Sequence, residues 1–318
     1  MKLSIVLTVF NKEQYLHNAF SALLGQHYTN DGDYEVLVVN DGSTDGSAVI
    51  VQEYAKSDSR VRVLTQKNQG LSMARNNGVD AAQGEYVWFV DADDTISKHA
   101  VHVICKAIEN SPDIIPIYGR TEGEDSVRNR VTVNAKSGKD ILVTGHWSPC
   151  GVFNVFRKAF LKENGLRFLP GIYHEDSEFT PRMLYVAKTV IVIPEVLYTV
   201  FRDPNSITQV PRAKRAFDYL IVADSLSRFV IDHNEDGTQI GRAIDAYTAQ
   251  DINNAFSIIT KNSKEDQVRF INDFHKKRNS YLRVLYSAPQ HKYRIEAFLF
   301  KLFPKRYVGI YRLLKWLS

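Results

Sequence analysis

The chain has 318 residues and a formal net charge of +4, with a composition typical of a soluble globular protein and only two cysteines, Cys105 and Cys150. This length suffices for one large domain or for a main domain with a smaller one. The cysteine content argues against a disulfide framework and a structural zinc site, and it fits a reducing compartment. No apolar run approaches the roughly 18–20 residues that span a bilayer, so we expect a cytoplasmic protein.

The first 120 residues alternate between apolar strands and helices. Met1–Phe10 lacks the small-residue cleavage site of a signal peptide and runs directly into Asn11, so a first core strand is expected here, at Leu3–Phe10. Asn11, with Gln14 three residues later, resembles a capping box for a helix that reaches about Gln26. Further strands are expected at Tyr34–Asn40, Val61–Thr65, Tyr86–Val90 and Ile114–Tyr118. A second helix is expected to end at about Ala55, and two more are expected at Leu71–Ala82 and Lys98–Glu109.

This alternation predicts the fold class and the place of a ligand. Continuous apolar strands separated by helices are typical of a mainly parallel sheet with helices on both faces. In such an α/β sheet, ligands bind beyond the C-terminal ends of the strands, where the strand order reverses. The polar clusters that follow Asn40 and Val90 fall at such strand ends.

After about Gly123 the pattern is less regular, with a possible strand at Ser126–Val133, a short helix at Phe156–Asn164 and two short strands within Val190–Arg202, separated by Pro194. Beyond Arg212 the sequence indicates helices, which we expect at Ala213–Ile231, Gln239–Thr260 and Lys264–Ser287, followed by a basic tail. We therefore expect an α/β domain over residues 1–210 and a helical C-terminal region over residues 211–318.

The tail from His291 to Ser318 concentrates the positive charge. Seven basic residues and one glutamate give this segment a charge of +6, which leaves −2 for the rest of the chain. Because the net positive charge is confined to one end, we expect no nucleic-acid partner. Apolar residues between Phe298 and Leu317 interleave with the basic ones, as in amphipathic helices that bind anionic membrane surfaces. Packing on the helical region and a dimer contact are the alternatives.

The most informative stretch is the strand Tyr86–Val90 and the segment Asp91-Ala92-Asp93-Asp94 that follows it. Like charges at the tip of a buried strand are costly unless a cation or hydrogen-bond donors compensate them. A divalent ion such as Mg²⁺ uses one or two carboxylates together with substrate phosphates. The alternative is an ordinary acidic turn after a strand, which is favoured only if this segment is considered without the other motifs.

Two other segments carry candidate ligand-binding groups. Asp41 follows a strand directly and could accept hydrogen bonds from a ligand, while Gly42 permits the tight turn. The segment from Asn68 to Gly78 begins with a glycine turn whose amides suit an anion, and Arg75 in the helix could reach a phosphate or a carboxylate. The alternatives are a capped turn at Asp41 and a solvated arginine at Arg75.

A second acidic cluster contains His174, Glu175, Asp176 and Glu178. Neighbouring carboxylates raise one another's pKa, as a general base requires. The charged first turn of a helix is the alternative. Further along, Arg202, Ser206 and Thr208 could form a lid over phosphates, although solvent exposure is the simpler interpretation.

Together these elements resemble the family 2 glycosyltransferases of the GT-A fold, of the type found in bacterial surface-polysaccharide assembly. The resemblance covers about the first 210 residues and rests on five motifs in order: Val9-Phe10-Asn11, Asn40-Asp41-Gly42-Ser43-Thr44-Asp45, Asn68-Gln69-Gly70 with Ala74-Arg75-Asn76, Asp91-Ala92-Asp93-Asp94, and Glu175-Asp176. It implies a Rossmann-like sheet flanked by helices.

The resemblance also implies roles for individual residues. Val9, Asn11, Asp41, Arg75, Asp91 and Ala92 would bind the donor nucleotide, with Asp41 at the base, uracil if the donor is a UDP-sugar. Asp93 would ligate a divalent metal, Mn²⁺ or Mg²⁺, that bridges the two phosphates. Asp176 would be the general base and Glu175 its support. The implied reaction is a metal-dependent, inverting transfer of one sugar to a glycan or a lipid-linked acceptor, at the inner face of the membrane.

Two departures from the family pattern limit this expectation. The frequent Asp-Asp-Gly-Ser is Asn40-Asp41-Gly42-Ser43, and the Gln-x-x-Arg-Trp of processive members is Gln209-Val-Pro-Arg212-Ala213. We therefore expect one sugar added per encounter. Two other hypotheses are a nucleotide-sugar or carbohydrate-binding protein without catalysis, against which the Glu175-Asp176 pair argues, and a Mg²⁺-dependent phosphoryl-transfer protein, for which no suitably placed lysine is found.

Overall fold

The structure is a computed structural model that describes residues 1–27, 32–201 and 212–317. The expected lid residues Arg202, Ser206 and Thr208, and Gln209, lie outside these ranges. The chain folds into two compact units: the first is Met1–Gly171 with Met183–Asp203, and the second is Ile172–Arg182 with Pro204–Ser318. The domain boundary expected at residue 210 remains a prediction, and the segment Ile172–Arg182 joins the C-terminal unit.

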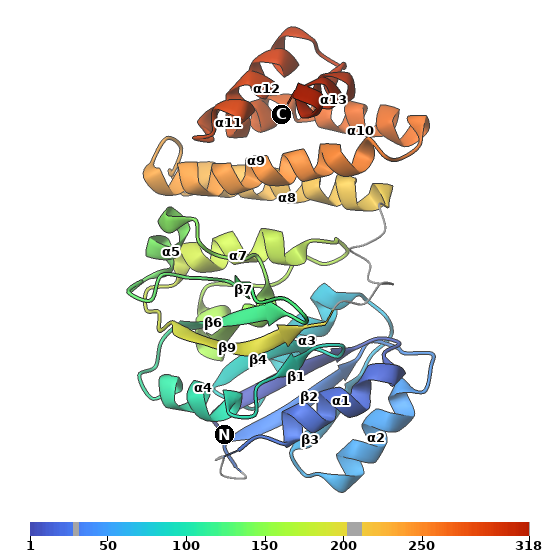
Figure 1. Ribbon diagram of the computed structural model, residues 1–318, viewed down its shortest axis with the longest axis vertical. Helices are drawn as coiled ribbons and strands as arrows, with labels where there is room; N and C mark the ends of the chain where they lie inside the picture. The colour runs from blue at the N-terminus through green and yellow to red at the C-terminus, as the bar shows by residue number, and fades with distance from the viewer. Residues whose placement is uncertain (28–31, 202–211, 318) are drawn as a thin grey trace. The chain divides into compact units, whose positions relative to one another are not determined.

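Within the described residues, the first unit contains one sheet of nine strands, drawn in Figure 1. The strands are β1 (Leu3–Val9), β2 (Tyr34–Asn40), β3 (Val61–Thr65), β4 (Tyr86–Asp91), β5 (Thr95–Ile96), β6 (Ile114–Thr121), β7 (Val127–Arg128), β8 (Asn154–Arg157) and β9 (Ile193–Val200). Their order is β3-β2-β1-β4-β8-β6-β9-β5, and β7 pairs with β6.

The strand order reverses beside β1. β1 pairs in parallel with β2 and with β4, and β3 pairs in parallel with β2. β8 then runs antiparallel to both β4 and β6, so the sheet is mixed, with the expected parallel arrangement in its N-terminal half. Every residue of β1 and β2 is buried, which explains their continuous apolar sequence. The crevice at the ends of β1 and β4 is where ligands bind in such sheets.

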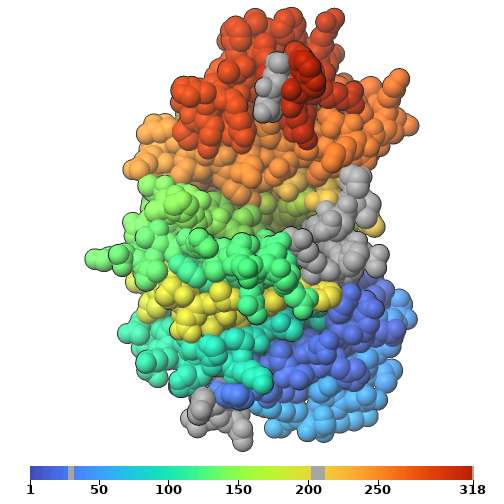
Figure 2. Space-filling view, viewed as in Figure 1, coloured from blue at the N-terminus to red at the C-terminus, as the bar shows by residue number. Residues whose placement is uncertain are grey.

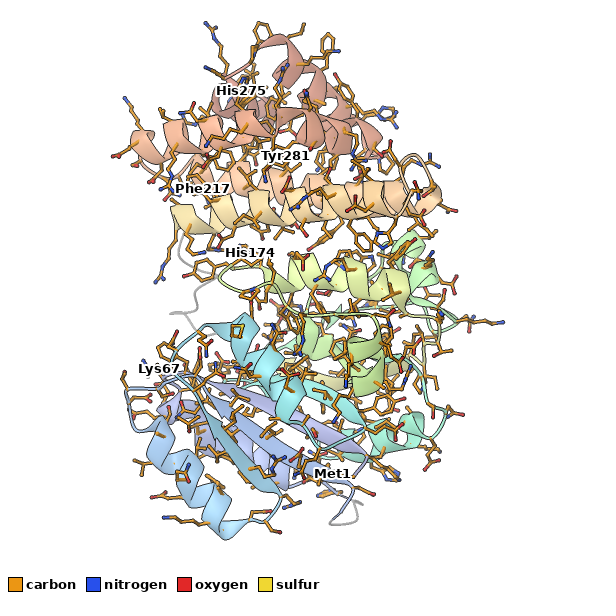
Figure 3. All side chains as sticks on the ribbon, turned by 180° about the vertical axis from the view of Figure 1, so that it is seen from behind. Met1, Lys67, His174, Phe217, His275 and Tyr281 are labelled. Atoms are coloured by element: carbon orange, nitrogen blue, oxygen red, sulfur yellow. The ribbon has the colours of Figure 1, made fainter. Side chains whose placement is uncertain are left out.

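Helices cover both faces of the parallel half. α1 (Glu13–Leu24) and α2 (Ser47–Ser57) lie on one face, and α3 (Leu71–Ala81) lies on the other, as Figures 1 and 3 show from opposite sides. A Cβ added at Gly78 of α3 would lie 2.4 Å from Cγ1 of Val6 in β1. Glycine at this position therefore lets α3 approach the sheet closely.

The remaining helices of the first unit are short and were only partly expected. They are α4 (Ala100–Ile108), α5 (Gly138–Thr144), the 3₁₀ turn η1 (Gly151–Phe153) and α6 (Lys158–Glu163). No element was expected at α5. The helix expected from Phe156 begins only at Lys158, because Phe156 belongs to β8, where it pairs with Val87 and Ile114.

Two strand predictions were wrong. Only Val127–Arg128 of the expected strand Ser126–Val133 is a strand. The segment around Pro194 forms one strand, β9, and not two. Ile193 pairs with Ile117 and Val196 with Tyr118, so Pro194 lies in an irregularity of the β6–β9 ladder. A bulge tolerates proline because the missing N–H leaves no ladder bond unmade there.

The second unit is helical. It contains the start of α7 (Glu175–Val186), then α8 (Ala213–Asp232), α9 (Gln239–Ile259), α10 (Lys264–Lys276), α11 (Arg278–Ser287), α12 (His291–Leu302) and α13 (Tyr307–Leu317). The single helix expected at Lys264–Ser287 is divided at Lys277, because Phe274 and Tyr281 on either side both pack into one core. α8 and α9 lie along each other, with α10–α13 on one side of the pair (Figure 1). In the described part of the chain, no helix is long and apolar enough to cross a membrane.

Candidate active site

The expected donor-binding residues of the first unit gather at the C-terminal ends of β1, β2 and β4. The carbonyl oxygen of Val9 accepts a hydrogen bond from the amide of Asp41 at 2.9 Å. Thr8, the preceding residue of β1, is paired in register with Asp91 of β4. Parallel pairing of three adjacent strands therefore brings together residues that lie far apart in sequence.

Asp91 is neutralised by a buried arginine. Its Oδ1 accepts hydrogen bonds from Oγ1 of Thr8 at 3.2 Å and from Nη2 of Arg75 at 3.3 Å. Arg75 is only 1% exposed, and its guanidinium lies 5.8 Å from the ring centre of Phe89 and 5.3 Å from that of Phe168. The alternative of a solvated arginine is thus wrong. The charge and the planar guanidinium of Arg75 are held next to Asp91, so Arg75 affects the site by orienting Asp91.

Asp93 forms an ion pair with a residue that sequence reasoning did not single out. Nζ of Lys12 lies 2.6 Å from Oδ2 of Asp93, and both side chains are mostly buried. The same ammonium lies 5.1 Å from the ring centre of Tyr15. Lys12 directly follows Asn11 in the loop after β1, at the same edge of the sheet as Asp91. This position is the feature of the sequence that could have indicated Lys12 as a site residue.

This arrangement allows a test of the expected metal. Within the described ranges, no three His, Cys, Asp or Glu side chains are grouped to hold a metal ion. Asp93 already holds one cation, the Lys12 ammonium, so its carboxylate faces a position suited to positive charge. A Mg²⁺ or Mn²⁺ ion that takes most of its oxygen ligands from phosphates needs only one or two carboxylates from the protein. A metal held by Asp93 and by phosphates is therefore compatible with the residues present, and its assignment to Asp93 stays a proposal.

Asp94 has a structural role. Its side chain is buried, and it accepts hydrogen bonds from the Tyr198 hydroxyl at 2.7 Å and from the Phe201 amide at 2.7 Å. Burial, together with the negative charge of Asp91, raises the pKa of Asp94 to about 8. A carboxyl with this pKa is largely protonated at neutral pH, so it joins β9 to the end of β4 without adding full charge.

Asp41 holds the segment that precedes α3. Its Oδ1 accepts hydrogen bonds from Nε2 of Gln66 at 2.7 Å and from the amide of Gln69 at 2.9 Å, and its Oδ2 accepts one from the amide of Gly70 at 2.8 Å. The amides at the start of α3, which were expected to bind an anionic group of a ligand, therefore bind the Asp41 carboxylate. A carboxylate has about four acceptor positions, so one remains for a ligand.

Asn11 links two loops and does not cap α1. Its backbone has φ of 52°, its amide donates to Oγ of Ser43 at 3.1 Å, and its Oδ1 accepts from the amide of Thr44 at 2.8 Å. The expected capping box with Gln14 is wrong, since the N-cap is Lys12 and carries no side-chain cap. The first amides of α1 are bonded instead by Ser47 and Asp45 of the neighbouring turn.

The second acidic cluster lies in the second unit, at the first turn of α7. His174, labelled in Figure 3, precedes the helix with φ of 64°, and its ring stacks on Tyr219 with centres 3.7 Å apart. Burial, with the nearby charge of Arg215, lowers the pKa of His174 to about 4, so this ring is neutral at pH 7.

The acidic residues of this cluster differ in their surroundings. Glu178 is bonded by Arg182 through two contacts, at 2.8 and 2.6 Å, and by Oγ of Ser225 at 2.7 Å. These contacts give Glu178 a structural role in joining α7 to α8. Glu175 is buried and Asp176 is half-buried, both in the first turn, where the helix dipole favours a negative charge.

A sequence model for glycosyl transferase family 2 matches residues 4–165, just over half of the chain. The match runs from β1 through α6 and so includes the ends of β1, β2 and β4. The chain belongs to glycosyl transferase family 2. This match confirms the family that the ordered motifs of the sequence indicated.

Curated relatives agree with this assignment. An uncharacterized glycosyltransferase of Bacillus subtilis, EpsJ, is 31% identical over 225 residues, which cover 65% of this chain and 63% of that protein. An uncharacterized glycosyltransferase of Escherichia coli, YibD, is 29% identical over 227 residues, which cover 66% of this chain and 64% of that protein. The family 2 chain therefore spans slightly less than two thirds of the length of these relatives.

The fold of the family 2 protein matches a solved structure over nearly its full length. The crystal structure of residues 1–349 of S. aureus TarS, in complex with UDP-GlcNAc, superposes with a TM-score of 0.77 over 99% of this chain and 90% of that one. The two sequences are 21% identical, so the likeness concerns the fold. It confirms the expected GT-A fold with a helical C-terminal region.

Proposed function

We propose that the protein transfers one sugar from a UDP-sugar to an acceptor hydroxyl, with inversion at the anomeric carbon. The observation that carries this proposal is the grouping of Asp41, Asp91 and Asp93 at the ends of three adjacent parallel strands, with Arg75 as the counter-charge of Asp91 and Lys12 as that of Asp93. Carboxylates at the switch point of an α/β sheet suit a nucleotide diphosphate when a divalent cation joins them to the phosphates. The UDP-GlcNAc in the TarS structure supports UDP as the nucleotide.

The donor roles follow the positions of the side chains. Asp41 receives an N–H of the base at its remaining acceptor position, next to the buried wall that Val9 provides. Asn11 fixes the turn that follows Asp41 through its two hydrogen bonds to that turn. Asp91, oriented by Thr8 and Arg75, and the buried Ala92 lie at the ribose and sugar.

Asp93 is the proposed ligand of a divalent metal. When bound, Mn²⁺ or Mg²⁺ acts as a Lewis acid that stabilises the charge developing on the leaving diphosphate. Lys12 pairs with Asp93 in the structure, and its ammonium would be able to pair with a donor phosphate if that carboxylate took a metal ion instead.

Asp176 is the proposed general base, with Glu175 beside it. The acceptor hydroxyl oxygen forms a bond to the anomeric carbon while the bond from that carbon to the phosphate oxygen breaks, and the hydroxyl proton passes to the Asp176 carboxylate. One displacement inverts the anomeric centre, and no second carboxylate acts as a nucleophile. The family resemblance favours a glycan or a lipid-linked acceptor in polysaccharide or glycolipid assembly, with transfer of a hexose-type sugar.

The proposal is tested by comparing Asp176→Asn with Asp232→Asn, an exposed site at the end of α8. UDP-, GDP- and dTDP-sugars are first screened with Mn²⁺ for thermal stabilisation, which identifies the donor. Nucleotide release is then measured with a panel of saccharide and lipid-linked acceptors. We expect Asp176→Asn to lose about 10²–10⁴-fold in turnover, the usual contribution of a general base, while donor stabilisation persists.

Asp232→Asn should behave as wild type. Wild-type turnover in Asp176→Asn would remove the assignment of the base. Donor stabilisation by the unmodified protein without any transfer or donor hydrolysis would instead indicate a binding protein that lacks catalysis.

A further inference from the structure

Large apolar side chains are exposed together on the last two helices. Six of them lie between residues 295 and 316, each with 47–81% of its surface accessible: Ile295, Phe298, Leu302, Phe303, Leu313 and Trp316. We call these six residues the outer face. The corresponding segment is the red surface at the end of the second unit in Figure 2. Exposed apolar residues are ordinary when scattered singly, but six within one short segment indicate an interaction surface.

α12 carries apolar residues on two opposite sides. Tyr293, Ala297 and Phe300 are buried in the core of the second unit. Because successive residues are about 100° apart around a helix, Ile295, Phe298 and Leu302 form one stripe on the opposite side. The buried stripe packs α12 into the bundle, and the outer stripe is exposed.

Basic residues border the outer stripe of α12 on both sides. By the same helical spacing, Lys292 lies on one flank and Arg294 and Lys301 lie on the other, and all three are exposed. The turn after the helix adds Lys305 and Arg306, also exposed, beside Phe303. An apolar stripe between two basic flanks is the pattern of helices that lie in a membrane interface.

α13 also has one buried and one exposed apolar side. Tyr307 and Tyr311 are buried, whereas Leu313 and Trp316 are exposed on the other side, and Trp316 has 81% of its surface accessible. Both helices pack on the same aromatic core, since the Tyr307 ring centre lies 5.1 Å from that of Phe300 in α12. The outer stripes of α12 and α13 therefore both face away from that core.

We propose that the outer face of α12 and α13 binds an anionic lipid surface. The tail 291–318 carries +6 in a chain whose total charge is +4. Five of its basic residues lie on α12 or in the turn after it, beside the exposed apolar groups, whereas Arg312 and Lys315 of α13 hydrogen-bond Thr260 and Ser257. Long basic side chains reach the headgroups while Trp, Phe and Leu enter the acyl boundary. A second copy of the chain is a poorer occupant, because it would bring +6 against +6 and would bury lysines, which protein interfaces avoid.

This inference goes beyond the proposed sugar transfer. Binding is measured without donor or acceptor, so the two proposals can fail separately. The full-length protein is sedimented with vesicles made of equal parts phosphatidylglycerol and phosphatidylcholine, and with vesicles of phosphatidylcholine alone. We expect binding to the anionic vesicles only. Raising the salt from about 0.1 M to about 1 M shortens the Debye length from about 10 Å to about 3 Å, and we expect it to weaken binding at least about tenfold.

The apolar contribution is tested with Phe298→Gln/Leu302→Gln/Trp316→Gln. Its matched control is Ile221→Gln/Ile231→Gln/Val268→Gln, three exposed apolar residues elsewhere in the second unit. We expect the first variant to bind anionic vesicles at least about tenfold more weakly and the control to bind as wild type. Because all six side chains are exposed, the melting temperatures should stay close to that of the unmodified protein.

The basic contribution is tested with Lys301→Glu/Lys305→Glu/Arg306→Glu. Its control is Lys56→Glu/Lys106→Glu/Lys162→Glu, which replaces exposed lysines of the first unit and changes the net charge by the same amount. Only the first should abolish binding. No binding of the unmodified protein to anionic vesicles would overturn the proposal. Equal binding of each variant and its control would also overturn it. The same holds if the unmodified protein forms a concentration-dependent dimer and the Phe298→Gln/Leu302→Gln/Trp316→Gln variant does not.

Discussion

At the scale of single residues, the three carboxylates within Asp91–Asp94 are kept apart by different partners. Asp91 is paired with a buried arginine, Asp93 with Lys12, and Asp94 is buried against Tyr198. The pKa of Asp94 is raised to about 8, so this carboxyl adds little charge at pH 7. Only Asp93 has a counter-charge on a long, flexible side chain, which another cation can displace. The local partners therefore favour Asp93, among the three, as the proposed metal ligand.

Glu296 provides a prediction about stability and pH. It is 3% exposed on α12, accepts a hydrogen bond from Nδ2 of Asn253 at 2.7 Å, and burial raises its pKa to about 7. Because the folded pKa lies above the unfolded value of about 4.3, stability from this group is fully present below about pH 4.3 and is lost as the pH rises to about 7.

Glu296→Gln should therefore stabilise the protein at pH 8, by up to about 3 kcal/mol, and should have little effect near pH 4. The difference in free energy of unfolding between variant and wild type, followed from pH 4 to pH 8, measures this. Glu265→Gln, at an exposed position of α10, is the control and should show no such trend. A difference for Glu296→Gln that does not change with pH would be inconsistent with a buried acid at this site.

The sequence predicted the acidic members of the candidate site better than their partners. Asp41, Asp91 and Asp93 each follow a strand, and strand ends are recognisable from apolar runs. Their partners come from elsewhere: Lys12 is 81 residues from Asp93, and Tyr198 is 104 residues from Asp94. Such pairs depend on which strands become neighbours, and no local spacing encodes that.

At the scale of elements, the closeness of α3 to the sheet yields a prediction. Replacing glycine by alanine inside a helix usually stabilises it by about 0.5–1 kcal/mol. At Gly78 the new Cβ would lie 2.4 Å from Val6, so Gly78→Ala should destabilise the protein by about 1–3 kcal/mol, as overpacking does.

Gly309 in α13 is the matched control, because an added Cβ would meet no atom within 4 Å there. Gly309→Ala should leave stability unchanged or raise it. Denaturant unfolding of both variants checks the pair. Stabilisation by Gly78→Ala would contradict the close packing of α3 on β1.

Elements with strong local signals were predicted, and those that depend on tertiary packing were not. The buried strands β1 to β4 lie within a residue of their expected bounds. α5 was missed although Ser137 and Asp140 form a capping box and Gly145 ends the helix in a left-handed conformation, so a usable signal was present. The division at Lys277 has no glycine or proline signal, because packing of α10 and α11 on a shared core decides it.

At the scale of the whole molecule, the site residues expected from the sequence are divided between the two units. The first holds the donor-side residues Asp41, Asp91 and Asp93, and the second holds Glu175, Asp176 and the basic tail. Ile172–Arg182 belongs to the second unit through hydrogen bonds such as those of Tyr173 with Asp218 and Ser177 with Tyr247, 45 and 70 residues apart. Sequence alone predicted the change from α/β to helical pattern, but not this exchange of a segment between units.

The proposed function depends most on one property of the first unit, that its strand ends bind UDP with the help of a metal at Asp93. Calorimetric titration of UDP, with Mn²⁺ or with a chelator, tests it for wild type, for Asp93→Asn and for Asp80→Asn, a control whose exposed ion pair with Arg167 contributes little. We predict that Mn²⁺ strengthens UDP binding at least about tenfold in wild type and Asp80→Asn but not in Asp93→Asn. UDP affinity that is the same with chelator and with Mn²⁺, or that Asp93→Asn leaves unchanged, would contradict this role of Asp93.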